Sequence, residues 1–186
     1  MDAGRVKPGR MVGMARVPAD DPGAAFAVDF LNTYDALDTP PERLSVARVR
    51  ELAARHGRHT WTDDLRDTDL EPLRELRERL RPVFAGPDKI AALNDVLAGS
   101  SAQIVTTPAI RLGAVGHGDA VQRLGVALAD VLAHTLAVGG PERLGACAGS
   151  PCHCVYIDRT RAGRQRYCCE LCNDRMAAAA YRRRRT

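Results

Sequence analysis

Apolar residues recur along most of the chain at the three- and four-residue spacing of amphipathic helices. The clearest stretch runs from Asp63 to Phe84, where leucines and a valine repeat at this spacing with Arg and Glu between them. This pattern predicts a helix with one buried stripe. Similar patterns predict helices from about Pro22, from Thr39 to near Gly57, over Pro87–Leu97 and over Asp119–Val138. The last of these is the longest, so we expect it to be the core helix.

Three segments interrupt the helical pattern and suggest how the chain is divided. Two short β-leaning runs, 103–108 and 110–115, predict a β-hairpin. Gly139-Gly140-Pro141 ends the last helix and marks a domain boundary. Residues 1–18 mix Gly, Pro and basic side chains without a period, and we expect a disordered leader there. The predicted fold is mainly α, with a helical domain over 19–138 and a separate module over 139–186.

All six cysteines of the chain lie in this C-terminal module. They form two clusters, Cys147-Ala-Gly-Ser-Pro-Cys152-His153-Cys154 and Cys168-Cys169-Glu-Leu-Cys172. A closed tetrahedral zinc site needs four thiolate or imidazole ligands, and two short loops of this kind can supply two each. The sequence therefore predicts one structural Zn²⁺, in a cytosolic protein whose thiols stay reduced.

Spacing alone leaves the ligand set open. Cys169-x2-Cys172 is a commoner loop than Cys168-x3-Cys172, and His153 or Cys154 could replace Cys152. A further hypothesis is a thiol switch, in which the surplus cysteines pair with ligands on oxidation and expel the metal.

The rest of the module predicts a β-hairpin followed by a helix. Residues 155–158 and 164–167 flank a turn at 159–163 and are expected to pair as strands. Asn173 and Asp174 suit a helix start, and residues 176–185 have high helix propensity. Two cysteine loops, a hairpin and a helix together make a finger of the treble-clef or zinc-ribbon type.

Positive charge is concentrated in the same module. Residues 1–141 carry 17 Lys and Arg against 19 Asp and Glu, a balance of −2, whereas residues 142–186 carry 10 against 4, a balance of +6. Arginine binds phosphate bidentately and can also read guanine, so this distribution favours nucleic acid as the partner over a merely solvated tail. The candidate contacts are Arg164, Arg166, Arg175, Arg182, Arg183, Arg184 and Arg185.

Two runs of residues resemble a known pair of domains. The finger resembles the CGNR zinc finger in its cysteine spacing, in Val155-Tyr-Ile-Asp158 and in the Arg three places after the last cysteine, although Cys172-Asn-Asp-Arg175 stands for Cys-Gly-Asn-Arg. The run Phe26-Ala-Val-Asp-Phe-Leu-Asn-Thr33 is similar to the start of the ABATE domain that precedes this finger. The resemblance implies the zinc ligands Cys147, Cys152, Cys168 and Cys172, and a transcriptional regulator that binds DNA.

The remaining residues offer a candidate ligand pocket in the helical domain and no candidate catalytic site. Asp29 and Asn32 are polar residues in an apolar stretch, and they either line a ligand pocket for an effector or satisfy a buried turn. The histidines lie near no nucleophile or carboxylate pair, and no phosphate loop or membrane-spanning run is present. We expect a cytoplasmic protein that is not an enzyme. An RNA-binding zinc ribbon and a zinc-stabilised protein-interaction module are the alternatives.

Overall fold

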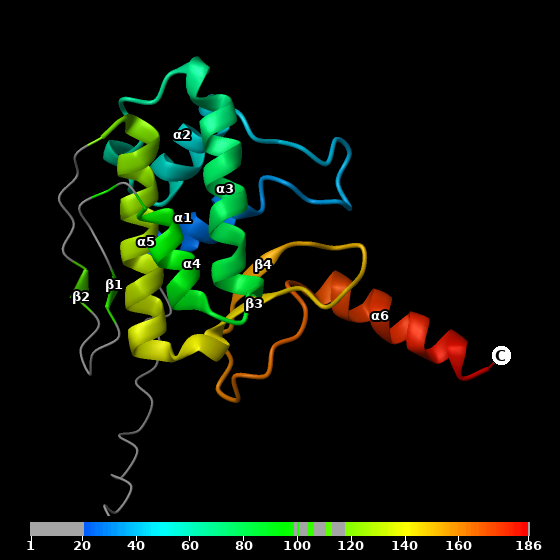
Figure 1. The fold of residues 1–186 in the computed structure, drawn as a ribbon. Helices are drawn as coiled ribbons and strands as arrows, with labels where there is room; N and C mark the ends of the chain where they lie inside the picture. The colour runs from blue at the N-terminus through cyan, green and yellow to red at the C-terminus, as the bar shows by residue number, and fades with distance from the viewer. Residues whose placement is uncertain (1–20, 99, 101–103, 106–110, 113–117, 186) are drawn as a thin grey trace, which may run out of the picture.

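Five helices form the body of the protein. The structure is a computed structural model, which describes residues 21–98, 100, 104–105, 111–112 and 118–185. They are α1 (Pro22–Leu31), α2 (Val46–Arg55), α3 (Leu70–Ala85), α4 (Lys89–Val96) and α5 (Ala120–Gly139), with single 3₁₀ turns at η1 (His59–Trp61), η2 (Asp67–Asp69) and η3 (Pro141–Arg143). Figure 1 shows the long helices α3 and α5 flanking α4. Their apolar stripes face one another and build one core, which confirms the predicted helical fold. The leader expected at 1–18 lies outside the described residues.

Helix α5 has the length and apolar composition of a membrane-crossing helix, alone among the described helices. Such composition is also that of a core helix, and α5 packs against α1, α3 and α4 with ten of its 20 residues buried. Its end matches the prediction. Gly140 follows with φ of 87°, a conformation that glycine adopts without a steric penalty, and Pro141 begins η3.

Two antiparallel strand pairs complete the fold. β1 (Ile104–Val105) pairs with β2 (Arg111–Leu112), which places a hairpin where one was predicted, although most of 103–115 lies outside the described residues. β3 (Leu144–Ala146) pairs with β4 (Val155–Ile157).

The prediction that residues 155–158 pair with residues 164–167 was therefore wrong, because residues 155–157 pair with β3 instead. Asp158 explains the difference, because its buried carboxylate accepts hydrogen bonds from the backbone N–H groups of Thr160 and Gln165, both at 2.8 Å. These bonds fold residues 159–166 into a loop, and β4 pairs instead with the strand that precedes the first cysteine.

The start of the second helix also differs from the prediction. α2 begins at Val46 and not near Thr39, with the Ser45 hydroxyl accepting from the Arg48 N–H at 3.1 Å. Glu42, which a helix starting at Thr39 would hold in its first turn, lies instead in an isolated β-bridge with Tyr34. Its carboxylate accepts two hydrogen bonds from the buried guanidinium of Arg77 on α3, each 2.8 Å long.

Replacing Glu42 by Gln is expected to lower the free energy of unfolding at pH 7 by about 2 kcal/mol, because Arg77 stays buried with a weaker partner. The Arg77 guanidinium holds the pKa of Glu42 at about 2, below its ordinary 4.5. A carboxyl group with a lowered folded-state pKa stabilises the fold above its unfolded pKa, and this contribution is lost as the pH falls from about 5 to about 2. The carboxyl is 32% exposed, so solvent screening reduces the contribution. Urea unfolding across this pH range measures it.

The matched control is Glu51→Gln, which removes an exposed carboxylate that pairs with Arg48 and Arg55. Arg48 and Arg55 lower the pKa of Glu51 too, but solvent screens these exposed ion pairs, so this variant should stay close to the wild-type stability profile at every pH. If Glu42→Gln were still fully destabilised at pH 3, the lost stability would not come from the ionised carboxylate.

The β3–β4 hairpin packs into the same core as the helices. Leu144, Val155 and Ile157 are buried in the cluster formed by α1 to α5, and the hairpin contacts α1 and α3. The C-terminal helix α6 (Glu170–Arg183) behaves differently. Figure 1 shows it leading away from the body, with the C-terminus at its far end. The β3–β4 hairpin is therefore packed into the core of the helical body, whereas α6 extends away from it.

Candidate metal centre

The first pair of candidate ligands lies in the loop between β3 and β4. The Cys147 N–H donates to the Cys154 carbonyl at 2.8 Å and continues the hairpin ladder by one bond. The Cys152 N–H then donates to the Gly149 carbonyl at 2.7 Å and closes a tight turn. A Cβ at Gly149 would lie 3.5 Å from the Cys147 sulfur and 3.4 Å from the Arg175 guanidinium, so the turn packs closely beneath α6. This turn directs the side chains of Cys147 and Cys152 to the same side.

The second pair stands at the start of α6. Cys168 comes just before the helix, and Cys172 lies in its first turn and is 2% exposed. The expected helix start at Asn173 and Asp174 was wrong. α6 begins at Glu170, whose charge complements the positive end of the helix dipole. A metal held by Cys172 is therefore bonded directly to the helix.

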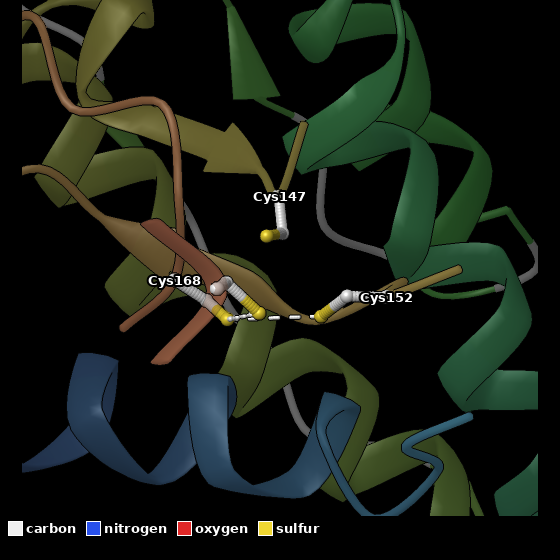
Figure 2. A group of neighbouring side chains, drawn as sticks. Cys147, Cys152 and Cys168 are labelled. Carbon is white, nitrogen blue, oxygen red and sulfur yellow. Dashed lines mark hydrogen bonds between the residues drawn. The ribbon is translucent and has the colours of Figure 1, made fainter. Parts of the chain in front are cut away.

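The four sulfurs of Cys147, Cys152, Cys168 and Cys172 all lie within 4.8 Å of one another. Figure 2 shows Cys147, Cys152 and Cys168 pointing toward a common centre from different segments. The Cys168 sulfur is 3.7 Å from those of both Cys152 and Cys172. Ligands about 2.3 Å from a tetrahedral zinc ion are separated by about 3.8 Å, so this arrangement fits Zn²⁺. The prediction of one structural zinc is confirmed.

The pKa values of the clustered thiols also indicate that the four cysteines need a bound cation to be ionised together. Burial and the neighbouring thiols of Cys152, Cys147 and Cys172 raise the pKa of Cys168. Burial is likewise the main cause that raises the pKa of Cys172 to about 12. Burial raises the pKa of Cys147, but hydrogen bonds from the N–H groups of Cys168 and Gly149 and from the thiols of Cys168 and Cys152 together outweigh it, so this pKa is lowered. Four adjacent thiolates repel one another unless a metal ion compensates their charge, and a bound Zn²⁺ supplies that compensation.

The two surplus cysteines occupy different environments. Cys169 is exposed and lies outside the four-sulfur cluster, so the structure brings Cys168 and not Cys169 to the centre. Cys154 is buried, 6% exposed, beside Cys152 and the carboxylate of Asp35. Burial, Cys152 and Asp35 all raise the pKa of Cys154. Among the described residues, His153 belongs to neither cluster of possible metal ligands, and its backbone carbonyl accepts a hydrogen bond from Arg81 at 2.7 Å.

The two residues predicted for an N-terminal pocket stand on α1 (Asp29) and at its C-terminal cap (Asn32), on the side that faces the finger. Asp29 and Asn32 line a cleft of about 510 Å³, together with Cys154, Val155 and other residues on the finger side. The Asp29 carboxylate also contacts His56 Nε2 at 2.8 Å. The Asn32 amide makes a two-way contact, since it accepts from the Val155 N–H at 2.8 Å and donates to the Val155 carbonyl at 3.0 Å. Asn32 thus joins the helical body to β4.

Replacing Asn32 by Ala is expected to lower the free energy of unfolding by about 2 kcal/mol, because both polar groups of Val155 lose their partner. Urea unfolding measures the loss, and faster hydrogen exchange at the Val155 amide should localise it. Asn173→Ala, at an exposed position on α6, is the matched control and should leave both unchanged. If hydrogen exchange at the Val155 amide were unaltered in Asn32→Ala, the two Asn32–Val155 hydrogen bonds would not be what holds β4 in place.

The predicted nucleic-acid contacts fall into three groups. Arg164 and Arg166 are exposed on the loop before α6, and the terminal arginines are exposed at its far end. The Arg185 guanidinium donates to the Tyr181 hydroxyl at 2.9 Å and lies over its ring. Arg175 is half-buried and donates to the Gly149 carbonyl at 2.9 Å, so it ties α6 to the first cysteine turn. Its contact with nucleic acid stays a prediction.

Other residues that shape the centre were missed by the sequence analysis. Lys89 donates to the carbonyls of Val83, Phe84 and Leu144 and joins α3 to β3, and Arg81 holds the loop beside Cys154. Burial lowers the pKa of Lys89. Nothing in the spacing of single charged residues on an amphipathic helix distinguishes such contacts from a solvated face.

Comparison with known families agrees with this architecture. Residues 143–185 match the family described as CGNR zinc finger, and residues 24–139 match ABATE, described as "Putative stress-induced transcription regulator". Among curated proteins, no sequence matches this chain. The ABATE match spans well over half of the 186 residues and stops just before η3, and the finger match begins inside that turn. The chain therefore belongs to the ABATE family and carries a CGNR zinc finger at its C-terminal side.

Proposed function

We propose that this protein is a zinc-dependent, DNA-binding transcriptional regulator whose finger and α6 contact the nucleic acid. One observation carries the proposal: most basic residues of the finger, among them Arg164, Arg166 and the four terminal arginines, are exposed on elements that lead away from a body of slightly negative charge. Residues 142–186 have a balance of +6, whereas residues 1–141 have a balance of −2. Such polarity orients the basic end toward a polyanion.

The shape of α6 suits entry into a groove. Its 14 residues make a rod about 21 Å long. Ala177 to Ala180 form a thin stem between the zinc centre and the terminal arginines, which lets the backbone approach closely. Of residues Glu170–Arg183, only Cys172 is buried, so most of the helix surface is open to a partner. The major groove of B-DNA accepts a helix of this width.

The loop before α6 adds a second basic contact surface. Arg164, Arg166 and Tyr167 border a groove of about 500 Å³ against the first turn of α6. The Arg166 guanidinium lies 5.9 Å from the centre of the Tyr167 ring. A guanidinium beside an aromatic ring can bind a phosphate and stack on a base or sugar. This groove supports a footprint that extends from the loop to the end of α6.

The helical body provides a means of control. The cleft of about 510 Å³ between α1 and the finger is lined by Asp29, Asn32 and Cys154, so a small molecule bound there would touch both parts. We infer that an effector in this cleft would alter how the finger is held.

Fluorescence anisotropy with labelled duplex DNA, at several salt concentrations and with DNA or RNA competitors, tests the proposal. The expected result is tight binding that weakens steeply with salt and is displaced by duplex DNA more effectively than by RNA. Preferential displacement by RNA would make the protein an RNA-binding zinc ribbon. Salt-insensitive binding of a protein partner, with no binding of either nucleic acid, would overturn the proposal in favour of an interaction module. Leu171, 80% exposed at the base of α6, would then be the first residue to test.

A further inference from the structure

A second group of metal-binding side chains adjoins the four-sulfur cluster. The carboxylate of Asp35 and the sulfurs of Cys152 and Cys154 lie within 4.8 Å of one another. Cys152 and Cys154 are buried, with exposures of 4% and 6%. We propose that these residues form a second metal subsite, which takes a thiophilic divalent ion such as Zn²⁺ or Cd²⁺ and shares the Cys152 sulfur with the structural zinc.

The backbone holds the three donors in place. Asp35 lies in the loop after α1, where its N–H donates to the Pro41 carbonyl and its Oδ1 accepts from the Leu37 N–H, both at 2.9 Å. Cys154 directly precedes Val155, whose backbone N–H and carbonyl are both hydrogen-bonded to the Asn32 amide at the end of α1. The loop after α1 and the cysteine turn are thus tied together by contacts that do not involve sulfur. The subsite is organised by the fold before any ion binds.

The donor set determines the class of ion. Two thiolates and one carboxylate suit a borderline or soft divalent ion, whereas Mg²⁺ and Ca²⁺ prefer oxygen ligands. A thiolate sulfur has enough lone pairs to bridge two ions, so Cys152 can serve both centres. The ion replaces the Cys154 proton and draws the Asp35 carboxylate into its coordination shell.

The subsite differs from the structural centre in being open. Its three protein donors leave a coordination position for water or an exchangeable ligand. Asp35 and Cys154 both line the cleft between α1 and the finger, so this position is reached from the cleft. Because Asp35 belongs to the helical body and the two cysteines to the finger, an ion here bonds the two parts to each other. We expect it to bind more weakly than the four-sulfur zinc and to exchange with the medium.

The test is a Co²⁺ titration of the full-length protein after removal of its metal under reducing conditions. The visible and near-ultraviolet absorption of cobalt thiolates counts the ions as they bind. The wild-type protein should take up two equivalents in sequence. Cys154→Ser and Asp35→Asn should each take up one tight equivalent with an unchanged four-thiolate spectrum, which also shows that the finger has folded. Cys169→Ser, which removes an exposed thiol outside the subsite, should keep both.

A gain-of-function variant makes the test independent of loss of folding. Asp35→Cys should bind the second ion more tightly and increase the thiolate charge-transfer absorption of that step. A wild-type protein that stops at one equivalent would overturn the proposal. So would a second equivalent that persists in both Cys154→Ser and Asp35→Asn, because the ion would then lie elsewhere. In either case Cys154 would be only a buried thiol beside the Asp35 carboxylate.

Discussion

Replacing Cys172 by Ser is expected to free α6 while helices α1 to α5 stay folded. Cys172 is the one residue of Glu170–Arg183 that is buried, and Arg175 adds a single hydrogen bond to Gly149. A lone helix of this length is marginal in water, so α6 depends on its metal anchor. Zinc ligation contributes about 10 kcal/mol or more in isolated fingers, so losing it should speed tryptic cleavage within α6 more than about 100-fold.

Zinc content, circular dichroism and limited trypsin digestion followed by mass spectrometry measure this result together. The helical signal should fall only by the share of α6, because Leu144, Val155 and Ile157 keep the hairpin in the main core. Cys169→Ser is the matched control, since it removes an exposed neighbouring thiol and should keep both zinc and protease resistance. Full protection of α6 in Cys172→Ser would show that packing, and not the metal, holds the helix.

The zinc centre was predictable because metal ligation imposes local spacing on the chain. A four-thiolate site needs two short cysteine loops whatever the conformation of the chain between them. The two cysteine pairs could therefore be recognised in the sequence alone. The choice of Cys168 over Cys169 depends on which of two adjacent side chains faces inward at the start of α6. Spacing left this choice open, and the structure places Cys168 in the cluster.

The path between the cysteine pairs was less predictable because it depends on single polar contacts. Residues 164–167 have the composition of a strand, but the carboxylate of Asp158 takes up the Gln165 N–H and bends the chain away. β3 is short and contains Gly145, which lies against the Tyr156 ring, so its pattern was too weak to predict a strand. Competition of this kind between a side chain and the backbone ladder is decided by tertiary structure.

The helices followed from periodicity, whereas the contacts that join them to the finger did not. Asn32 was singled out as a polar residue in an apolar stretch, and the alternatives were a pocket and a satisfied turn. It lines the cleft and also bonds Val155, a residue 123 positions away. Long-range hydrogen bonds of this sort have no signature in a single sequence. The Asn32–Val155 hydrogen bonds fix β4 against α1, and they therefore help to set the direction in which α6 extends from the helical body.

Replacing Arg182, Arg183, Arg184 and Arg185 together by Ala is expected to weaken binding to duplex DNA and to flatten its salt dependence. All four side chains are exposed beyond the alanine stem. Each guanidinium that neutralises a phosphate contributes about 0.9 to the slope of log K against log salt, so the slope should become shallower by about 2 to 3.6. At about 0.1 M salt the affinity should fall by roughly 10² to 10³-fold.

A charge-preserving variant, with Lys at the same four positions, separates the electrostatic attraction to phosphates from the bidentate hydrogen bonding of the guanidinium groups. Lysine keeps the point charge but loses the bidentate fork, so this variant should retain most of the salt slope while losing some affinity. Zinc content and the protease resistance of Glu170 to Ala180 should be unchanged in both variants, because these arginines lie far along α6 from Cys172. An unaltered salt slope in the Ala variant, with the finger intact, would assign the phosphate contacts to Arg164 and Arg166 on the preceding loop.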